Sequence, residues 1–286
     1  MATVRPVGIT INEIHTLGSR LVVRLPYFVV DAFASAVFRG NPAGVCPLER
    51  WLPEATLQSI AAENNLAETA FFVPDGPGYH LRWFTPTQEV PLCGHATLAS
   101  AFIVFTRLQP DLRDVHFQTL SGPLSVARDG DWLMLDLPRY APVHSQDKLA
   151  DLERGLGVHV IEAFRVDDDP NYFAVVADEE TVRQTHPRLD VLAALHPYGV
   201  AVTAAGESAD FVSRYFAPSY GIPEDPATGS IHAALTPYWS AQLHRTTMRA
   251  LQLSHRGGEL RCELLDERVR VAGQAFEYLE GHITVP

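Results

Sequence analysis

Residues 91–97 (PLCGHAT) combine groups that suit acid–base chemistry. Cys93, Gly94 and His95 stand directly before a long apolar run of the kind found in buried helices. Glycine lets a ligand approach the backbone, a helix N-terminus lowers the pKa of a thiol, and imidazole titrates near neutral pH. Proton transfer is one interpretation of this segment; the other is a small buried cysteine beside a helix-capping histidine.

Residues 224–230 (EDPATGS) form a second segment of the same kind. Asp225, Gly229 and Ser230 precede another mostly apolar run, so they would lie where a helix begins. A carboxylate, a hydroxyl and free backbone N–H groups can bind a polar ligand there. The same residues, together with Thr228, are also ordinary helix caps.

Glu68 is the third candidate, because it leads into the apolar residues 70–73 (AFFV). Burial against such a strand raises the pKa of a carboxyl group, which suits a residue that must accept and return a proton. A glutamate at a solvated strand edge would keep its ordinary pKa.

The elements that must position these residues occur in the same order in both parts of the chain. Apolar and β-branched runs bounded by Gly, Pro and Asn predict the strands, and helical spacing or long apolar runs predict the helices. Strands are expected at residues 21–25, 27–32, 44–46, 69–73, 79–84, 172–176, 199–203 and 211–216, and helices at 53–63, 96–108, 189–195 and 231–243.

Short motifs repeat along with the elements. Residues 82–86 (RWFTP) match residues 214–218 (RYFAP), and after a three-residue insertion Glu89, Pro91 and Gly94 match Glu224, Pro226 and Gly229. An internal duplication would bring two helix N-termini to one cleft between two similar halves. Free N–H groups and partial positive charge at such termini favour a bound carboxylate.

Composition and charge exclude several classes of protein. The 286 residues carry a net charge of −12 without a basic tract, which disfavours nucleic acid and anionic membranes as partners. Three cysteines without paired spacing, Cys46, Cys93 and Cys262, predict neither a disulfide framework nor a structural zinc site. No apolar stretch approaches the roughly 20 residues of a membrane span, and no signal peptide is visible, so we expect a cytoplasmic protein.

Familiar cofactor and metal motifs are missing from the sequence. There is no GxGxxG, GxxxxGK[ST], HExxH or GxSxG, and the 12 histidines are scattered. We therefore expect neither a cofactor nor a metal.

Taken together, the motifs resemble those of the PhzF-like family of phenazine-biosynthesis isomerases, which have the diaminopimelate-epimerase-like fold. The resemblance runs from about Tyr27 to the C-terminus. It rests on residues 31–33 (DAF), 40–42 (GNP), 65–69 (NLAET), 93–97 (CGHAT), 224–230 (EDPATGS), 237–239 (PYW) and 256–258 (RGG).

The resemblance implies an α/β (α+β) protein of two pseudo-symmetric halves, each a bent sheet wrapped around a central helix. Residues 1–138 would form the first half, to which a C-terminal strand at about 275–286 returns, and residues 139–274 the second. A homodimer and catalysis without a cofactor are also implied. Residues 1–25 precede the usual family start, and either an extra edge strand or a disordered tail would account for them.

The resemblance also implies roles for individual residues in proton transfer on a small carboxylate-bearing substrate. Glu68 would shuttle the proton, and His95, Asp225 and Ser230 would bind and polarise the substrate. Further substrate contacts are expected from Asn41, Cys93, Gly94, Gly229 and, as a carboxylate clamp, Arg256.

The sequence departs from diaminopimelate epimerase, which uses two opposed cysteines. Cys93 occupies the first-half position, but the second-half motif holds Asp225 and no thiol. A two-thiol epimerase is therefore disfavoured, and the isomerase is the main hypothesis. An epimerase or racemase with Cys93 and Asp225 as opposed bases, and a catalytically silent binding protein of the same fold, are the alternatives.

Overall fold

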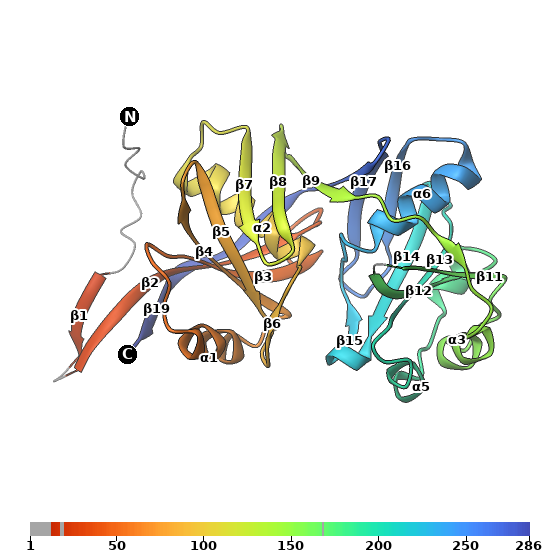
Figure 1. Cartoon of the computed structure of the whole chain (residues 1–286), viewed down its shortest axis with the longest axis horizontal. Helices are drawn as coiled ribbons and strands as arrows, with labels where there is room; N and C mark the ends of the chain where they lie inside the picture. The colour runs from red at the N-terminus through yellow and green to blue at the C-terminus, as the bar shows by residue number, and fades with distance from the viewer. Residues whose placement is uncertain (1–12, 18–19, 168) are drawn as a thin grey trace.

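The computed structural model describes residues 13–17, 20–167 and 169–286, which form two lobes side by side (Figure 1). Within this part of the chain, 19 strands are linked by hydrogen bonds into one continuous sheet. The strands of each lobe pack against one long helix, α2 (Gly94–Ile103) in the first and α6 (His232–Leu243) in the second. The expected α/β architecture of two halves built on central helices is confirmed.

The first lobe carries the N-terminal elements and one strand from the end of the chain. Its elements are β1 (Glu13–Leu17), β2 (Arg20–Ala32), β3 (Asn41–Pro47), α1 (Glu54–Asn64), β4 (Glu68–Asp75), β5 (Gly78–Phe84), β6 (Glu89–Val90), α2, the π-helix η1 (Val104–Leu108), β7 (Asp114–Thr119), β8 (Gly122–Asp129), β9 (Trp132–Pro138) and β19 (Ala275–Val285).

The second lobe carries the elements between β9 and β19. They are β10 (Val143–His144), α3 (Leu149–Leu156), β11 (Glu162–Val166), β12 (Asp169–Val175), α4 (Glu179–Arg183), α5 (Leu189–Ala193), β13 (Gly199–Ala205), β14 (Phe211–Ala217), the 3-10 helix η2 (Pro218–Tyr220), β15 (Ile222–Asp225), α6, β16 (Thr247–Gln252), β17 (Gly258–Leu264) and β18 (Arg268–Gly273).

The strand pairings of the two lobes match one for one. In the first lobe β3 pairs parallel with β4, β5 pairs antiparallel with β4 and β6, and β5 pairs parallel with β7. In the second lobe β12, β13, β14, β15 and β16 repeat these pairings in the same order and sense. Each lobe then ends in an antiparallel run, β7 to β9 or β16 to β18. This topology supports the duplication expected from the motifs.

One strand pairing and one crossing of the chain join the lobes. β9 pairs antiparallel with β18, so the last strand of each repeat contacts the other repeat. β19 then crosses back and pairs along β2, which places the C-terminus in the first lobe (Figure 1). Because the sheet continues between the lobes, the division of the chain at residues 138 and 274 remains a prediction.

Helix α2 is the centre of the first lobe. It contacts β2, β3, β4, β8 and β9, and nearly all of its side chains are buried, as expected for a helix that is apolar on every side. Leu98 and Ile103 of α2, and Phe105 of the adjoining η1, are almost completely enclosed, and full burial of such a side chain stabilises the fold by about 1.5–3 kcal/mol. This packing fixes the N-terminus of the helix, where Cys93, Gly94 and His95 lie.

Helix α6 holds the corresponding place in the second lobe and continues through Pro237, as predicted. A proline inside a helix leaves the carbonyl four residues earlier without its N–H partner. Here that carbonyl belongs to Ala233, and it accepts a hydrogen bond of 3.2 Å from the backbone N–H of Tyr140. A neighbouring segment thus satisfies the group that the proline leaves free.

The two strands expected at residues 21–25 and 27–32 are in fact one strand, β2, which runs through Pro26. On one side of β2, β1 pairs with residues 20–24 and β3 with residues 28–32. Pro26 lies in the gap between these neighbours, and on the other side of β2 it is opposite His282 of β19.

The N-terminal segment is described only in part. Residues 1–12 lie outside the described residues, whereas β1 pairs antiparallel with β2. In the described part of the chain, no helix is long and apolar enough to span a membrane. The three cysteines are free and buried.

Candidate active site

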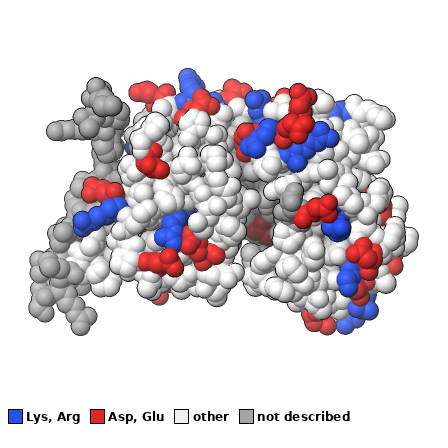
Figure 2. All heavy atoms as spheres, viewed as in Figure 1, with Lys and Arg blue, Asp and Glu red and all other residues white. Residues whose placement is uncertain are grey.

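A cavity of about 270 Å³ lies between the lobes and brings the two motifs together. Glu68, Cys93, Gly94 and His95 line it from the first lobe, and Asp225, Gly229 and Ser230 from the second. Among the described residues that line the cavity, Glu68 and Asp225 are the acidic ones, and neither Lys nor Arg is present. In Figure 2 acidic atoms lie recessed in the hollow between the two lobes.

The N-termini of α2 and of the turn that opens α6 meet at this cavity. Cys93 is the extended residue before α2, and the turn at residues 229–231 leads into α6 at His232. A Cβ atom placed on Gly94 would lie 3.6 Å from the backbone N of Ser230 and 3.7 Å from Cα of Gly229. Amide groups in the first turn of a helix have no intrahelical acceptor, so the two termini together form a place for an anion.

Glu68 begins β4 and points into this cavity. Its Oε2 atom lies 3.3 Å from Nε2 of His95, and among the described residues neither atom has a hydrogen-bond partner of good geometry. Burial, with the nearby charge of Asp225, raises the pKa of Glu68 to about 8, against the opposing effect of a hydrogen bond from Cys93. Glu68 is thus a buried carboxyl group that holds its proton at neutral pH.

His95 is enclosed in the first turn of α2, with only 5% of its surface exposed. Burial lowers its pKa to about 3, so the ring is neutral throughout the physiological range. Nδ1 faces the Nδ2 atom of Asn41 at 3.1 Å and Sγ of Cys93 at 3.5 Å. A neutral imidazole can offer one N–H to a ligand, but it cannot offer a positive charge.

Asp225 ends β15 with both carboxylate oxygens engaged. Oδ1 accepts a hydrogen bond of 2.8 Å from Asn41 Nδ2, and Oδ2 accepts one from the hydroxyl of Thr228. Burial raises the pKa of Asp225 to about 6, against the lowering effect of these hydrogen bonds. Near pH 7 the cavity therefore holds an ionised Asp225 and a protonated Glu68, a division typical of acid–base sites.

Cys93 departs from the sequence expectation. A helix N-terminus lowers the pKa of a thiol, but the pKa of Cys93 is raised well above its usual value, first by burial and then by the charge of Glu68. Desolvation therefore outweighs the helix terminus, and Cys93 is a neutral thiol at physiological pH.

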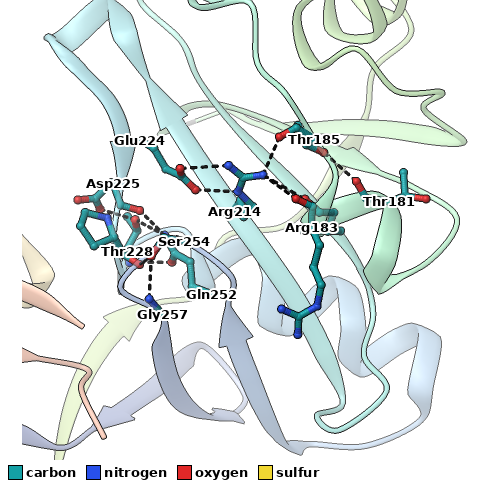
Figure 3. Close-up of polar contacts among 12 residues, drawn as sticks. Thr181, Arg183, Thr185, Arg214, Glu224, Asp225, Thr228, Gln252, Ser254 and Gly257 are labelled. Carbon is teal, nitrogen blue, oxygen red and sulfur yellow. Dashed lines mark hydrogen bonds and ion pairs between the residues drawn. The ribbon is translucent and has the colours of Figure 1, made fainter. Parts of the chain in front are cut away.

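Strand β15 is held from the side opposite the cavity. Arg214 donates hydrogen bonds of 2.7 and 3.1 Å to Glu224, and its third nitrogen donates to the carbonyl of Thr185 at 2.7 Å (Figure 3). The repeat places a matching pair in the first lobe, where Arg82 donates to both carboxylate oxygens of Glu89 at 2.7 and 2.6 Å. The RWF and RYF motifs thus anchor the short strand before each site segment.

Two residues at the edge of the site were not identified as site residues from the sequence. Gln252, fully buried in β16, accepts from the backbone N–H of Thr228 and donates to the carbonyl of Asp225, so it fixes the loop that carries the aspartate (Figure 3). Tyr215 lines the cavity and donates a hydrogen bond of 2.6 Å to Asn171. A single glutamine within a strand gives no local sequence signal that it supports a site. Tyr215, in contrast, lies in the repeated RYFAP motif and could have been identified from it.

Arg256 and Asn41 do not line the cavity, contrary to expectation. The Arg256 guanidinium donates to Asp31 at 2.7 Å and to the carbonyl of Gly40 at 2.8 Å, so it ties β2 and its following loop to the second lobe. A role as a carboxylate clamp on the substrate does not fit these contacts. Asn41 is fully buried behind the cavity wall and contacts Asp225 and His95 instead of open space.

Glu68, Cys93 and His95 also form a set of donors with metal-binding chemistry. One ligand atom from each lies within 4.8 Å of the others. Metal binding would require Cys93 and Glu68 to release protons, and a bound cation would itself lower both pKa values.

The fold and the site together define the class of protein: a two-lobed protein of the diaminopimelate-epimerase-like fold with titratable groups between its lobes. A hydroxyproline epimerase of Agrobacterium vitis shares this fold, with a TM-score of 0.59 and 11% sequence identity over 92% of each chain.

The particular family follows from closer comparisons. The family model for phenazine biosynthesis-like proteins (PhzC-PhzF) matches residues 30–281. A PhzF family protein of Enterococcus faecalis is 48% identical, with a TM-score of 0.87, over 91% of this chain and 99% of that one. A Pseudomonas aeruginosa protein named as an uncharacterized isomerase is 46% identical over 91% of this chain and 98% of its own length. The chain belongs to the PhzC/PhzF family, as the motifs predicted.

Proposed function

We propose that the protein is an isomerase that moves a proton within a small carboxylic acid, without a metal or an organic cofactor. One observation carries the proposal: a buried carboxyl group with a pKa of about 8 lies in the same cavity as two helix N-termini. The relative named as an isomerase, and the epimerase that shares the fold, support isomerase or epimerase activity in general.

The substrate carboxylate would bind between the lobes. Backbone N–H groups at Gly94 and His95 would hold it from one side, and those at Gly229 and Ser230 from the other. Since no Lys or Arg lines the described cavity, these amides and the helix termini supply the positive potential. The same groups would stabilise enolate-like charge as it develops on the substrate.

Glu68, in its ionised form, would remove a proton from the carbon next to an activating group. The C–H bonding pair becomes the π bond of an enolate-like intermediate, and the proton stays on the Glu68 carboxyl group. Glu68 then returns it to a different carbon, so the substrate is isomerised and the enzyme is regenerated. One positioned acid–base group of this kind accelerates a reaction by about 10²–10⁴-fold.

His95, Asp225 and Ser230 would orient and polarise the substrate around Glu68. Neutral His95 offers a hydrogen bond without adding charge, and ionised Asp225 would pair with a polar or cationic substituent. Cys93 would contribute shape and a weak hydrogen bond. Its raised pKa makes it a poor base at neutral pH.

An epimerase is the second candidate, and the shared fold with hydroxyproline epimerase favours it. Cys93 and Asp225 would then act from opposite faces of one carbon. The raised thiol pKa counts against this arrangement. A binding protein without turnover is the third candidate, and a cavity holding two carboxyl groups of shifted pKa counts against it.

The test begins with a thermal-shift screen of small carboxylic acids, followed by NMR of each ligand in deuterated water. An isomerase moves a double bond, and deuterium enters the new C–H bond to the extent that the Glu68 proton exchanges with solvent before it is returned. An epimerase exchanges hydrogen at one stereocentre. Glu68→Gln should retain ligand binding and lose at least 100-fold in exchange. The matched control is Glu63→Gln, at an exposed site on α1 that does not line this cavity. Equal exchange by Glu68→Gln and the wild type would remove Glu68 from the mechanism.

A further inference from the structure

Asn41 has an unusual position for an uncharged polar side chain, because it is fully buried and bridges both lobes. It begins β3 in the first lobe, and its Nδ2 atom lies 2.8 Å from Oδ1 of Asp225 and 3.0 Å from the carbonyl of Ala227 in the second. The same nitrogen lies 3.1 Å from Nδ1 of His95. Three acceptor positions thus surround one amide nitrogen.

The neighbours of the Asn41 amide determine which way it points. A carboxylate and a carbonyl can only accept hydrogen bonds, so the group that faces them must be the NH₂ donor. Turning the amide over would set its oxygen against Asp225 and Ala227, and three acceptors would repel one another. In the observed orientation Oδ1 has no hydrogen-bond partner among the described residues, which is consistent with a side chain placed for its donor end.

The orientation of the Asn41 amide limits which ring nitrogen of His95 can carry the proton. A neutral imidazole carries its proton on one nitrogen, and the other nitrogen accepts. The two hydrogens of the Asn41 amide lie closest to Asp225 and Ala227, and its nitrogen cannot accept a hydrogen bond. A proton on Nδ1 would be set against this NH₂ group at 3.1 Å, with only Sγ of Cys93 at 3.5 Å as an acceptor, so the contacts favour an unprotonated Nδ1 and a proton on Nε2. Nε2 lies 3.3 Å from Oε2 of Glu68, without hydrogen-bond geometry between the two atoms. A proton on Nε2 would therefore lie beside the carboxyl group that we propose as the proton shuttle.

We propose that Asn41 is a positioning residue that fixes His95 in its Nε2–H tautomer and orients Asp225 with the same amide group. The proposal deepens the proposed function, since it assigns the form in which His95 meets the substrate. His95 would act as a hydrogen-bond donor beside Glu68, and it would not act as a second base. The Asn41 amide would thereby couple His95 in the first lobe to Asp225 in the second. The tautomer of His95 would then depend on the two lobes being packed together.

The experiment needs no substrate, because the tautomer is visible in the ligand-free protein. Long-range ¹H–¹⁵N correlation spectra of ¹⁵N-histidine-labelled protein at pH 7 distinguish protonated from unprotonated ring nitrogens. The His95 signals are assigned by their loss in His95→Gln. The expected wild-type result is an unprotonated Nδ1 and a protonated Nε2. A proton on Nδ1, or on both nitrogens, would overturn the proposal.

Variants of Asn41 test its causal role. Asn41→Asp keeps the shape but presents only acceptors to Nδ1, so the proton should move to Nδ1 or both nitrogens should become protonated. Asn41→Ala is the second variant, for use if Asn41→Asp does not fold. It removes the donor without adding charge and should give a mixture of His95 tautomers. The control is Asn64→Ala, whose amide donates to Thr69 at 3.2 Å and does not contact His95; its spectrum should match the wild type.

Unchanged Nε2–H signals in a folded Asn41→Asp or Asn41→Ala variant would show that Asn41 does not set the tautomer. This outcome is independent of catalysis. If the tautomer shifts as expected while no carboxylic acid undergoes exchange, the positioning role stands and the proposed isomerase function fails.

Discussion

The Glu68 carboxyl group and the His95 ring come from different elements, yet Oε2 and Nε2 lie 3.3 Å apart in the lining of the cavity between the lobes. Glu68 begins β4, whereas His95 belongs to the first turn of α2. Burial acts on the two groups in opposite directions, raising the pKa of the acid and lowering that of the base. Both are therefore neutral at rest, which lets the cavity enclose them without an unpaired charge.

Turnover should rise with pH through the pKa of Glu68. Proton removal needs the carboxylate, so below about pH 8 only a fraction of the enzyme is in the active form. We expect kcat/KM for hydrogen exchange to rise by about tenfold per pH unit well below the pKa and to level off above it. Asp225 is coupled to Glu68, so the midpoint belongs to the pair. Exchange rates measured from pH 5 to 9 test this, and a flat profile contradicts it.

Glu68 should also make stability depend on pH. Its pKa rises from 4.5 to about 8 on folding, so between these values the folded protein holds a proton that the unfolded chain has lost. The free energy of unfolding therefore falls as pH rises across this window. Glu68→Gln removes the effect and should be more stable than the wild type at pH 8, by on the order of a few kcal/mol, with a much smaller difference at pH 4.5.

Urea denaturation at the two pH values measures this effect, with Glu63→Gln as the exposed-carboxylate control. The same stability difference at pH 4.5 and pH 8 would mean that Glu68 does not titrate in this range.

Cys93 should be unreactive while the protein is folded. Its thiol is buried, which is the main obstacle to forming the thiolate, the reactive form; the charge of Asp225, and that of Glu68 where it is ionised, add to it. At pH 7.5 we expect iodoacetamide to modify Cys93 at least about tenfold more slowly than a free cysteine. Cys46 and Cys262 are buried as well, so all three thiols should react only after addition of urea. Rapid labelling of Cys93 in the folded protein would favour the thiol-based epimerase.

The site segments could be predicted from the sequence because each is contiguous and lies where a strand or helix begins. The motif repeat also indicated that the segments containing His95 and Asp225 lie in equivalent places, and the matched strand pairings agree. Glu68 was identified by its apolar neighbours, and its burial follows from the same neighbours.

Long-range partners could not be predicted. Arg256 lies 225 positions from Asp31, and Asn41 lies 184 positions from Asp225, so no local pattern separates an arginine that binds a substrate from one that joins two lobes. The expectation of a lowered thiol pKa at Cys93 was wrong for a different reason. A helix N-terminus and burial act on Cys93 in opposite directions, and their balance depends on how much water the packed cavity admits.

Gly94 and Gly229 lie beside each other at the cavity, and alanine should act differently at the two positions. At Gly94 a Cβ atom would meet Leu135 at 3.4 Å and the Ser230 nitrogen at 3.6 Å, which are ordinary contacts. At Gly229 it would lie 2.8 Å from Cζ of Phe33, a buried ring that must move. Gly229→Ala should therefore lose about 1–3 kcal/mol of stability, as overpacked cores do.

Gly94→Ala should instead fold with wild-type stability or better, because alanine favours a helix by up to about 1 kcal/mol over glycine. Its methyl group would lie against the amides that we propose bind the substrate carboxylate, so affinity should fall at least about tenfold, or about 1.4 kcal/mol. Urea denaturation and calorimetric titration with a carboxylic acid from the screen measure the two effects. Gly281→Ala, on β19, controls for the substitution itself. If Gly94→Ala binds the acid as tightly as the wild type does, the carboxylate is not held between the helix termini.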